Sequence, residues 1–231
     1  MSLRLLLLSL LTFIGGALAA PLDGITFAAE PGKLYLPVHE AARELGLVTG
    51  LDDAGHVVTL GGVEFKPGAL RQLVDGTELV HVQQLADAGV EVSAPNADGT
   101  VRVGGLFRGF SLRAGEQRVE VSLAKQQLRG WQGSRLVLQT RISSGRNGRT
   151  PAGEFKAGPY RARMHRSSRY NNAPMPWSVQ FNGHVFIHGF TSVPNYPASH
   201  GCIRVPLNEG NPAKFFYEWV LNGTPVKVTQ E

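Results

Sequence analysis

The second half of the chain consists mainly of short apolar segments separated by polar turns. Strand-like segments, some with alternating apolar and polar positions, lie at residues 117–123, 134–142, 179–181, 185–187 and 225–228. Segments of this length, rich in β-branched residues and bounded by turn residues, are typical of strands. Residues 106–231 are therefore predicted to form a mainly β domain, built as a sandwich of mixed sheets.

One helix is predicted in this half of the chain. Asn211 is a suitable N-cap, Pro212 suits the first helical position, and Gly223 is a suitable end. An apolar stripe lies between these positions, formed by Phe215, Phe216, Trp219 and Val220. Large apolar side chains at helical spacing indicate packing against a core and argue against a ligand-binding role.

The first half contains an internal repeat, in which residues 44 positions apart correspond. Leu36 corresponds to Val80, and Ala42 to Ala86. Each copy has a short apolar strand, a helix-like stretch, a polar turn and a second strand, and Gly46 ends the first helix-like stretch. Two such units bury faces that neither covers alone. The pattern predicts a small α/β module over residues 21–105.

Residues 1–20 have the features of a secretory signal peptide. Arg4 precedes an apolar run from Leu5 to Ile14, and small residues follow up to Ala19. The apolar run is shorter than the roughly twenty residues that span a bilayer. Residues 1–20 are therefore predicted to be removed, which leaves an exported protein of the periplasm or cell envelope with no stable membrane insertion.

Charge divides the chain in two. Residues 21–105 hold five Lys and Arg against twelve Asp and Glu, whereas residues 106–231 hold seventeen against six. Residues 141–169 alone hold eight basic residues and one Glu. This segment suits a carboxylate-rich partner or an anionic wall polymer, and a solvated basic face without a specific ligand is the open alternative. Export and the lack of a nucleic-acid-binding motif argue against nucleic acid.

Cys202 is the only cysteine, so the chain can form no internal disulfide. A buried cysteine that acts as a small apolar residue is one interpretation. In an exported protein, where thiols meet oxidants, a single retained thiol is more typical of a reactive group. His39, His56 and His81 lack the spacing of metal ligands, so no metal site and no cofactor are predicted.

The segment from Ile187 to Val205 carries the candidate chemistry: a His-Gly pair, a loop and a Ser-His-Gly-Cys-Ile-Arg run. A thiol attacks an acyl carbon as its thiolate, so Cys202 needs a neighbouring base. His200 lies two residues before it, and His188 ends an apolar strand from which the loop can return. Gly201 allows backbone N–H groups to approach a substrate closely, as an oxyanion hole requires.

Two other residues of this run have open alternatives. The Arg204 guanidinium matches a carboxylate and suits the acidic end of a peptide, or it forms a structural ion pair. Ser199 either forms a turn or orients a histidine.

This run resembles the signature of the L,D-transpeptidase catalytic domain (YkuD-like): a His-Gly followed, after a loop, by Ser/Thr-x-Gly-Cys, an apolar residue and Arg or Asn. Further motifs agree with that family over about residues 115–229, namely Gly145 with the Thr150-Pro151 to Phe155 run, Met175-Pro176-Trp177, and Asn222 to Val226. The repeat, with GKLYLPVHEAARELG and GTELVHVQQLADAG, resembles the copper amine oxidase N-terminal-like domain of secreted bacterial proteins, a name that implies no copper here.

The L,D-transpeptidase resemblance implies a role for each residue of the site. Cys202 is the nucleophile, His188 the general base, and His200 a nearby polarising or proton-relay group. The backbone of Gly189 orients the His188 ring, in place of a Ser or Asp that follows the histidine in some relatives. The N–H groups of Gly201 and Cys202 form the oxyanion hole. A tyrosine assists this hole in some relatives, and the sequence matches none to that position.

The substrates implied by the resemblance are peptidoglycan stem peptides. The thiolate attacks the carbonyl carbon that precedes terminal D-alanine, releases D-alanine and leaves a thioester, which an amine of a neighbouring stem resolves into a cross-link. Two alternatives stay open. Water as the acceptor makes an L,D-carboxypeptidase of the same fold, and an inert cysteine makes a non-catalytic cell-wall-binding protein.

Overall fold

The computed structural model describes residues 20–104 and 108–231. The predicted signal peptide lies outside these ranges except for its last residue, and the predicted domain boundary between residues 105 and 106 lies outside them as well. Within the described ranges, every helix is too short or too polar to span a bilayer.

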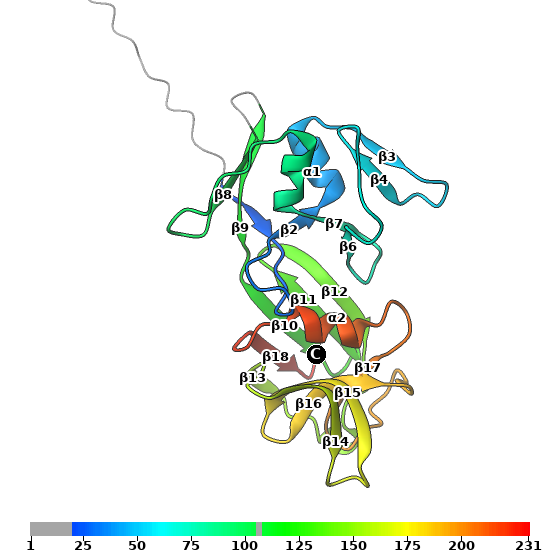
Figure 1. Cartoon of the computed structure of the whole chain (residues 1–231). Coiled ribbons are helices and arrows are strands. Elements are labelled where there is room, and N and C mark those ends of the chain that lie inside the picture. Colours follow the sequence, from blue (N-terminus) through cyan, green and yellow to red (C-terminus); the bar gives the residue numbers. More distant parts are fainter. Residues whose placement is uncertain (1–19, 105–107) are drawn as a thin grey trace, which may run out of the picture.

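The two copies of the repeat build matching elements that pair with each other (Figure 1). Strand β2 (Tyr35–Pro37) lies antiparallel to β7 (Glu78–His81), with the equivalent residues Leu36 and Val80 opposite each other. Helix α1 (Val38–Leu45) directly follows β2, and the 3-10 helix η1 (Val82–Ala88) directly follows β7. The second helix-like stretch is therefore a 3-10 helix. The Gln84 side chain caps the start of η1 by accepting the His81 N–H at 3.0 Å.

Short strands complete this part of the molecule. They are β1 (Leu22–Gly24), β3 (Thr49–Leu51), β4 (Val57–Leu60), β5 (Val63–Glu64), β6 (Arg71–Gln72), β8 (Val101–Gly104) and β9 (Gly109–Ala114). The sheets have the orders β2-β7-β6, β3-β4-β5 and β1-β9-β8. Strand β9 follows the predicted boundary and still pairs with β1 and β8, so the exact division between the two units stays a prediction.

Two mixed sheets form the second part, which agrees with the predicted fold class. The first has the order β12-β11-β10-β18-β13 and the second the order β14-β15-β16-β17. Their strands are β10 (Gln117–Ser122), β11 (Gln127–Gln132), β12 (Arg135–Arg141), β13 (Gly153–Lys156), β14 (Arg161–Ser167), β15 (Ala173–Asn182), β16 (Val185–Phe190), β17 (Ile203–Pro206) and β18 (Pro225–Thr229). All five predicted segments fall in strands, and β11, β13, β14 and β17 are additional. The pairs β10–β18 and β16–β17 are parallel.

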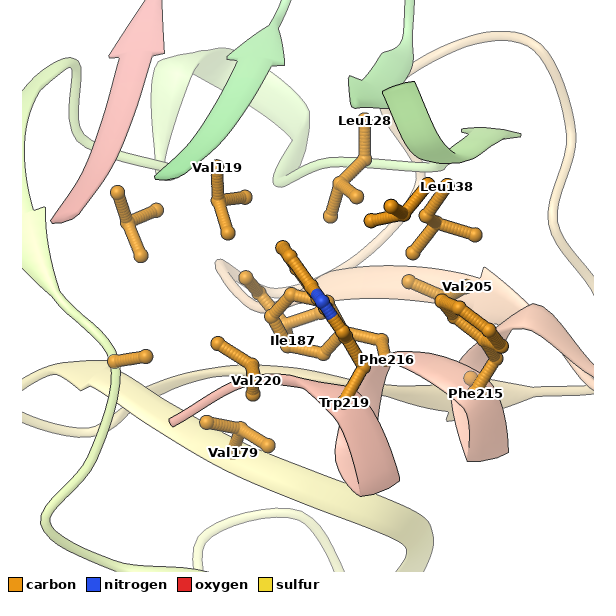
Figure 2. Packing of buried hydrophobic residues seen from close by; sticks show 14 of the residues in the cluster. Val119, Leu128, Leu138, Val179, Ile187, Val205, Phe215, Phe216, Trp219 and Val220 are labelled. Atoms are coloured by element: carbon orange, nitrogen blue, oxygen red, sulfur yellow. The ribbon is translucent and has the colours of Figure 1, made fainter. Parts of the chain in front are cut away.

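Helix α2 (Pro212–Trp219) lies between the two sheets (Figure 2). The Asn211 side chain caps it by accepting the Lys214 N–H at 3.0 Å. The helix ends before Val220 and not at Gly223, so the predicted end was wrong. Val220 is buried and extended, with φ −67° and ψ 130°, because the chain must leave the helix there to reach β18.

The core of the second part lies around α2. Phe216 and Trp219 lie between Leu128 and Leu138 of the first sheet and Ile187 of the second (Figure 2). All five side chains are at most 2% exposed. Burying large apolar side chains of this kind contributes about 1.5–3 kcal/mol each. This core fixes the inner face of β16, the strand that carries His188.

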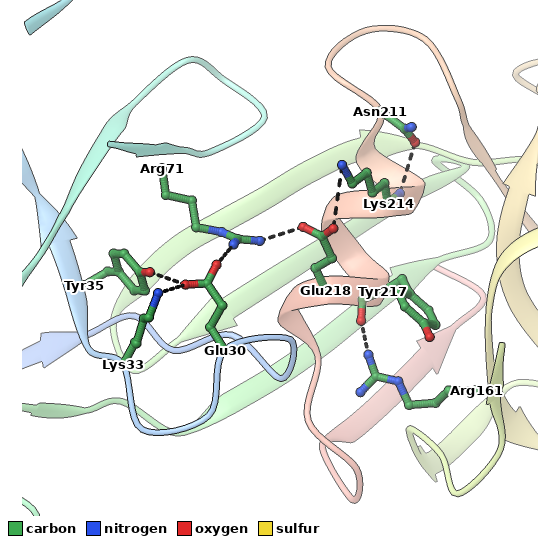
Figure 3. Close-up of polar contacts among 9 residues, drawn as sticks. All are labelled: Glu30, Lys33, Tyr35, Arg71, Arg161, Asn211, Lys214, Tyr217 and Glu218. Atoms are coloured by element: carbon green, nitrogen blue, oxygen red, sulfur yellow. Dashed lines mark hydrogen bonds and ion pairs between the residues drawn. The ribbon is translucent and has the colours of Figure 1, made fainter. Parts of the chain in front are cut away.

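The N-terminal part is joined to this core by apolar and ionic contacts. Phe27 packs edge-on against Phe215 of α2, with ring centroids 5.7 Å apart. Arg71 forms ion pairs with Glu30 and with Glu218 of α2, the latter at 2.6 Å (Figure 3). The Arg71 guanidinium also lies 3.7 Å from the centroid of the Phe27 ring. The two parts therefore share one continuous packed region.

Candidate active site

Cys202 lies at the end of the loop that joins the parallel strands β16 and β17, one residue before β17 begins. The side chain is half-buried, and its Sγ lies 3.8 Å from the carbonyl oxygen of His184. The thiol thus lies directly before β17, faces the turn that precedes β16, and is partly exposed to solvent.

The register of β16 and β17 brings the start of β17, which follows Cys202, beside the strand that carries His188. Ile187 pairs with Ile203 and His188 with Arg204. Both isoleucines are buried in the core, and side chains alternate along a strand. His188 and Arg204 therefore lie on the opposite face of the sheet, away from α2, and Cys202 directly precedes β17.

The His188 ring is buried and held by its neighbour. It is 5% exposed, and its Nδ1 lies 2.9 Å from the carbonyl oxygen of Gly189. A carbonyl only accepts, so Nδ1 carries the proton and Nε2 keeps a free lone pair. Burial lowers the pKa of His188 to about 4, against the opposing effect of the Gly189 carbonyl. The imidazole is consequently a neutral base at pH 7.

The thiol and the imidazole are both uncharged in this arrangement. Burial raises the pKa of Cys202, and the backbone of Phe186 and the Arg204 guanidinium offset part of that effect. Among the described residues no hydrogen bond joins Cys202 to His188, since the thiol faces the His184 carbonyl. The site therefore suits proton transfer at the moment of attack and not a preformed thiolate–imidazolium pair.

Ser199 closes a tight turn around the nucleophile. Its Oγ accepts the Gly201 N–H at 3.0 Å and donates to the Cys202 carbonyl at 2.5 Å. These bonds match the turn interpretation of Ser199, and neither one reaches a histidine. The Gly201 N–H already has an acceptor here, which leaves its role in an oxyanion hole a prediction.

The loop that contains Gly145 and Thr150 supports this turn through hydrogen bonds. The Thr150 hydroxyl accepts the Gly145 N–H and donates to the Gly201 carbonyl, both at 2.7 Å. A Cβ on Gly145 would lie 2.8 Å from the Gly201 Cα, so a side chain at residue 145 would displace the turn. The sequence pattern singled out both Gly145 and Thr150 as motif residues, and the structure gives them this supporting role.

His200 is exposed and has partners other than the thiol. Its Nε2 lies 2.8 Å from Nη2 of Arg146, which can only donate, so the ring accepts. Its ring stacks on Tyr170 with centroids 4.3 Å apart and 14° between the planes. The sequence analysis did not identify Tyr170 as part of the site. The only signal for it in the sequence was that Tyr170 directly follows the basic segment 141–169.

Arg204 lies on the same face as the thiol, with its Cζ 4.2 Å from the centroid of the Phe190 ring. No carboxylate pairs with it among the described residues, so the structural ion pair considered for Arg204 is not formed. Within residues 20–104 and 108–231, no three side chains of His, Cys, Asp or Glu are grouped to hold a metal ion.

The half-buried thiol and the buried neutral imidazole lie within the part of the chain that matches a known catalytic domain. Residues 116–228 match the YkuD family, described as the L,D-transpeptidase catalytic domain. This match contains Cys202, His188 and His200, and it confirms the L,D-transpeptidase catalytic domain predicted for this part of the chain. No curated protein matches the chain. The copper amine oxidase N-terminal-like resemblance stays a prediction.

Several solved structures are similar to the chain. An L,D-transpeptidase from Xylanimonas cellulosilytica is 32% identical over 50% of this chain and 61% of its own, with a TM-score of 0.44. One from Stackebrandtia nassauensis is 24% identical over 49% of this chain and 55% of its own, also with a TM-score of 0.44. One from Mycobacterium smegmatis is 15% identical over 91% and 100%, with a TM-score of 0.45. The chain thus spans 61% and 55% of the first two structures.

Proposed function

We propose that the chain is a peptidoglycan L,D-transpeptidase with Cys202 as nucleophile and His188 as general base. The observation that carries the proposal is the position of Cys202 directly before β17, which runs parallel to β16, the strand that carries His188. The Gly189 carbonyl holds His188 in the tautomer whose Nε2 is free. The family match over residues 116–228 supports the same chemistry.

In the first step the Cys202 sulfur attacks the carbonyl carbon that joins the third stem residue to terminal D-alanine. The thiol proton moves to His188 Nε2 as the carbon–sulfur bond forms. The carbon–nitrogen bond then breaks, and the departing amine of D-alanine takes that proton. Free D-alanine leaves, and the peptide stays attached to Cys202 as a thioester.

In the second step the amine of a neighbouring stem attacks the thioester carbonyl. It gives a proton to His188, the carbon–sulfur bond breaks, and the sulfur recovers the proton as the free thiol. Negative charge develops on the carbonyl oxygen in both steps. In this proposal the backbone N–H of Cys202 stabilises it, and the Gly201 N–H joins it if Ser199 releases that group.

The expected setting of this reaction is the periplasm or cell envelope, because residues 1–20 have the composition of a secretory signal. The basic segment 141–169 suits anionic wall polymers as a second partner.

Product masses test the proposed function directly. The mature chain, incubated with defined disaccharide tetrapeptides, is expected to release D-alanine and form cross-linked dimers. Tripeptides without dimers would show that water resolves the thioester, which is the carboxypeptidase alternative. Binding to wall material without release of D-alanine would favour the non-catalytic alternative and contradict the proposal.

The pH dependence tests the base. Attack requires the neutral His188 ring, whose pKa burial lowers to about 4. We therefore expect kcat/KM to stay level as pH falls from 7 to about 5 and to decline around pH 4, well below the usual imidazole range near 6.5. Steady-state kinetics between pH 3.5 and 8 would show this. A decline centred near pH 6.5 would contradict the buried neutral base, and in His188→Gln the decline should vanish along with most of the rate.

A further inference from the structure

Three arginines from two separate segments neighbour the turn that holds Cys202. Arg146 and Arg149 lie in the loop that supports the nucleophile turn, and Arg204 lies two residues beyond the thiol. Arg146 and Arg149 are exposed and Arg204 is half-buried. The catalytic steps described above require none of the three, so their common position needs another explanation.

Backbone contacts fix the two loop arginines beside the thiol. The Arg146 N–H donates to the Ser199 carbonyl at 3.1 Å, and its guanidinium holds the His200 ring at 2.8 Å. A Cβ placed on Gly201 would lie 3.5 Å from the Arg149 carbonyl oxygen and 4.0 Å from the Arg149 Cβ. Both arginines therefore start from backbone that touches the residues immediately before Cys202.

The three groups share one electrostatic environment. Partial burial lowers the pKa of His200, and Arg146, Arg149 and Arg204 each lower it further. Arg146 also lowers the pKa of Arg204, whose largest shift comes from its own burial. Effects of this kind fall off with distance, so all three arginines lie within electrostatic reach of the His200 ring, and Arg146 lies within reach of Arg204.

This cluster lacks the acidic partners that other arginines have. Arg71, Arg135 and Arg141 each pair with a carboxylate at 2.6 to 2.8 Å. None of Arg146, Arg149 and Arg204 has such a partner among the described residues. A group of like charges beside a reactive thiol, left without counter-charge by the protein, suits an anionic ligand that arrives with the reacting peptide.

We propose that Arg146, Arg149 and Arg204 form a carboxylate-binding rim that selects donor stem peptides with free carboxylates over stems whose carboxylates are amidated. This inference rests on the proposed function and adds its substrate selectivity. An amide has the size of a carboxylate, but it has no charge, and an NH2 donor replaces one acceptor oxygen. A guanidinium has only donors, so it cannot accept a hydrogen bond from that NH2 group. The position beside the thiol favours the reacting peptide over a long phosphate polymer.

The test compares two donor tetrapeptides that differ only in having free or amidated stem carboxylates. Loss of one charge-assisted hydrogen bond typically lowers affinity by about tenfold or more. We therefore expect kcat/KM of the unaltered chain to be about tenfold or more higher for the free-acid stem than for the amidated stem. Arg149→Gln should lower kcat/KM for the free-acid stem and leave the amidated stem nearly unchanged, so that the preference narrows.

The matched control is Arg163→Gln. Arg163 is exposed on β14 within the same basic segment and forms no ion pair among the described residues, so its replacement removes the same charge away from the rim. It should leave the preference intact. Equal rates for the two stems in the unaltered chain would overturn the proposal. Equal losses in Arg149→Gln and Arg163→Gln on both stems would overturn it too, because they indicate general attraction.

A binding measurement separates this proposal from the proposed function. Calorimetry on Cys202→Ala with each stem needs no turnover and should show tighter binding of the free-acid stem. If that preference is present while D-alanine release by the unaltered chain is absent, the rim stands and the transpeptidase assignment fails. If both stems bind Cys202→Ala equally while a poly(glycerol phosphate) chain binds tightly, the rim serves an anionic polymer and the proposal is wrong.

Discussion

Replacing Cys202 with alanine is expected to abolish D-alanine release and cross-linking. The sulfur forms the covalent intermediate in the proposed reaction, and no other side chain of the site can take its place. Losing an essential nucleophile typically lowers kcat by about a thousandfold or more. Mass spectrometry after incubation with a tetrapeptide donor or a carbapenem should show a covalent adduct on the unaltered chain and none on the variant.

The structure predicts that this variant keeps its fold. Cys202 is half-buried, and the turn around it is held by Ser199 and Thr150 through backbone groups that alanine preserves. The thermal midpoint should therefore stay within a few degrees of the unaltered chain. His188→Gln is the companion variant, because it should retain alkylation of Cys202 by iodoacetamide while turnover falls. Cross-linking by Cys202→Ala, or an adduct on another residue, would rule out the assigned nucleophile.

The sequence predicted the elements whose determinants are local. Val119 and Val121 alternate with polar residues and lie in β10, and Asn211 with Pro212 marks the start of α2 as the structure has it. The repeat was visible because the strand–helix succession recurs at a fixed spacing, and Leu36 and Val80 lie opposite each other in the sheet. Alternation, capping and repetition act over a few residues, so they can be read without knowledge of the packing.

Packing decided what the sequence did not predict. Helix α2 ends at Trp219, before the predicted Gly223, because Val220 is extended and buried in the core. A suitable stop residue in the sequence does not show where the chain must leave the helix. The second helix-like stretch became a 3-10 helix for a similar reason, since its propensity was compatible with either form. Elements of weak intrinsic preference take the geometry that their neighbours impose.

The candidate site shows the same division. His188 and Gly189 lie on β16 and Cys202 directly precedes the adjoining β17, so their relation follows from one short motif and a parallel register. The stacking of Tyr170 on His200 depends instead on where the β14–β15 hairpin lies relative to the loop before β17. Contacts between loops that are distant in sequence have no periodic signal, so a single sequence does not contain them in readable form.

The opposite charges of the two halves also acquired a structural meaning. Arg135 of β12 pairs with Glu40 of α1 at 2.6 Å, and Arg71 pairs with Glu218 of α2 (Figure 3). The Arg135–Glu40 pair thus offsets part of the charge asymmetry where the two parts meet, whereas in the Arg71–Glu218 pair the base comes from the acidic half. Arg146, Arg149 and Arg204 have no acidic partner among the described residues, and the proposed rim gives this part of the basic charge a role toward the substrate.

The largest loss of stability is expected from Trp219→Ala. Trp219 is fully buried at the C-terminal end of α2, and its ring lies so close to β11 that a Cβ on Gly130 would be 2.8 Å from it. Removing a buried tryptophan typically costs about 3–5 kcal/mol, because apolar burial is lost and a cavity remains. Urea denaturation should show a large fall in the midpoint concentration.

The variant also breaks a polar link. The Trp219 Nε1–H donates to Gln132 Oε1 at 2.9 Å, and the same oxygen accepts the Thr26 N–H at 3.1 Å. Trp131→Ala is the matched control, since Trp131 is half-buried and contacts Arg118 and Glu120 near the surface. It should cost about 1 kcal/mol. Comparable losses in both variants would show that α2 does not organise the core. A much larger loss at Trp219 would show that packing against α2 stabilises the core on which β16, the strand that carries His188, rests.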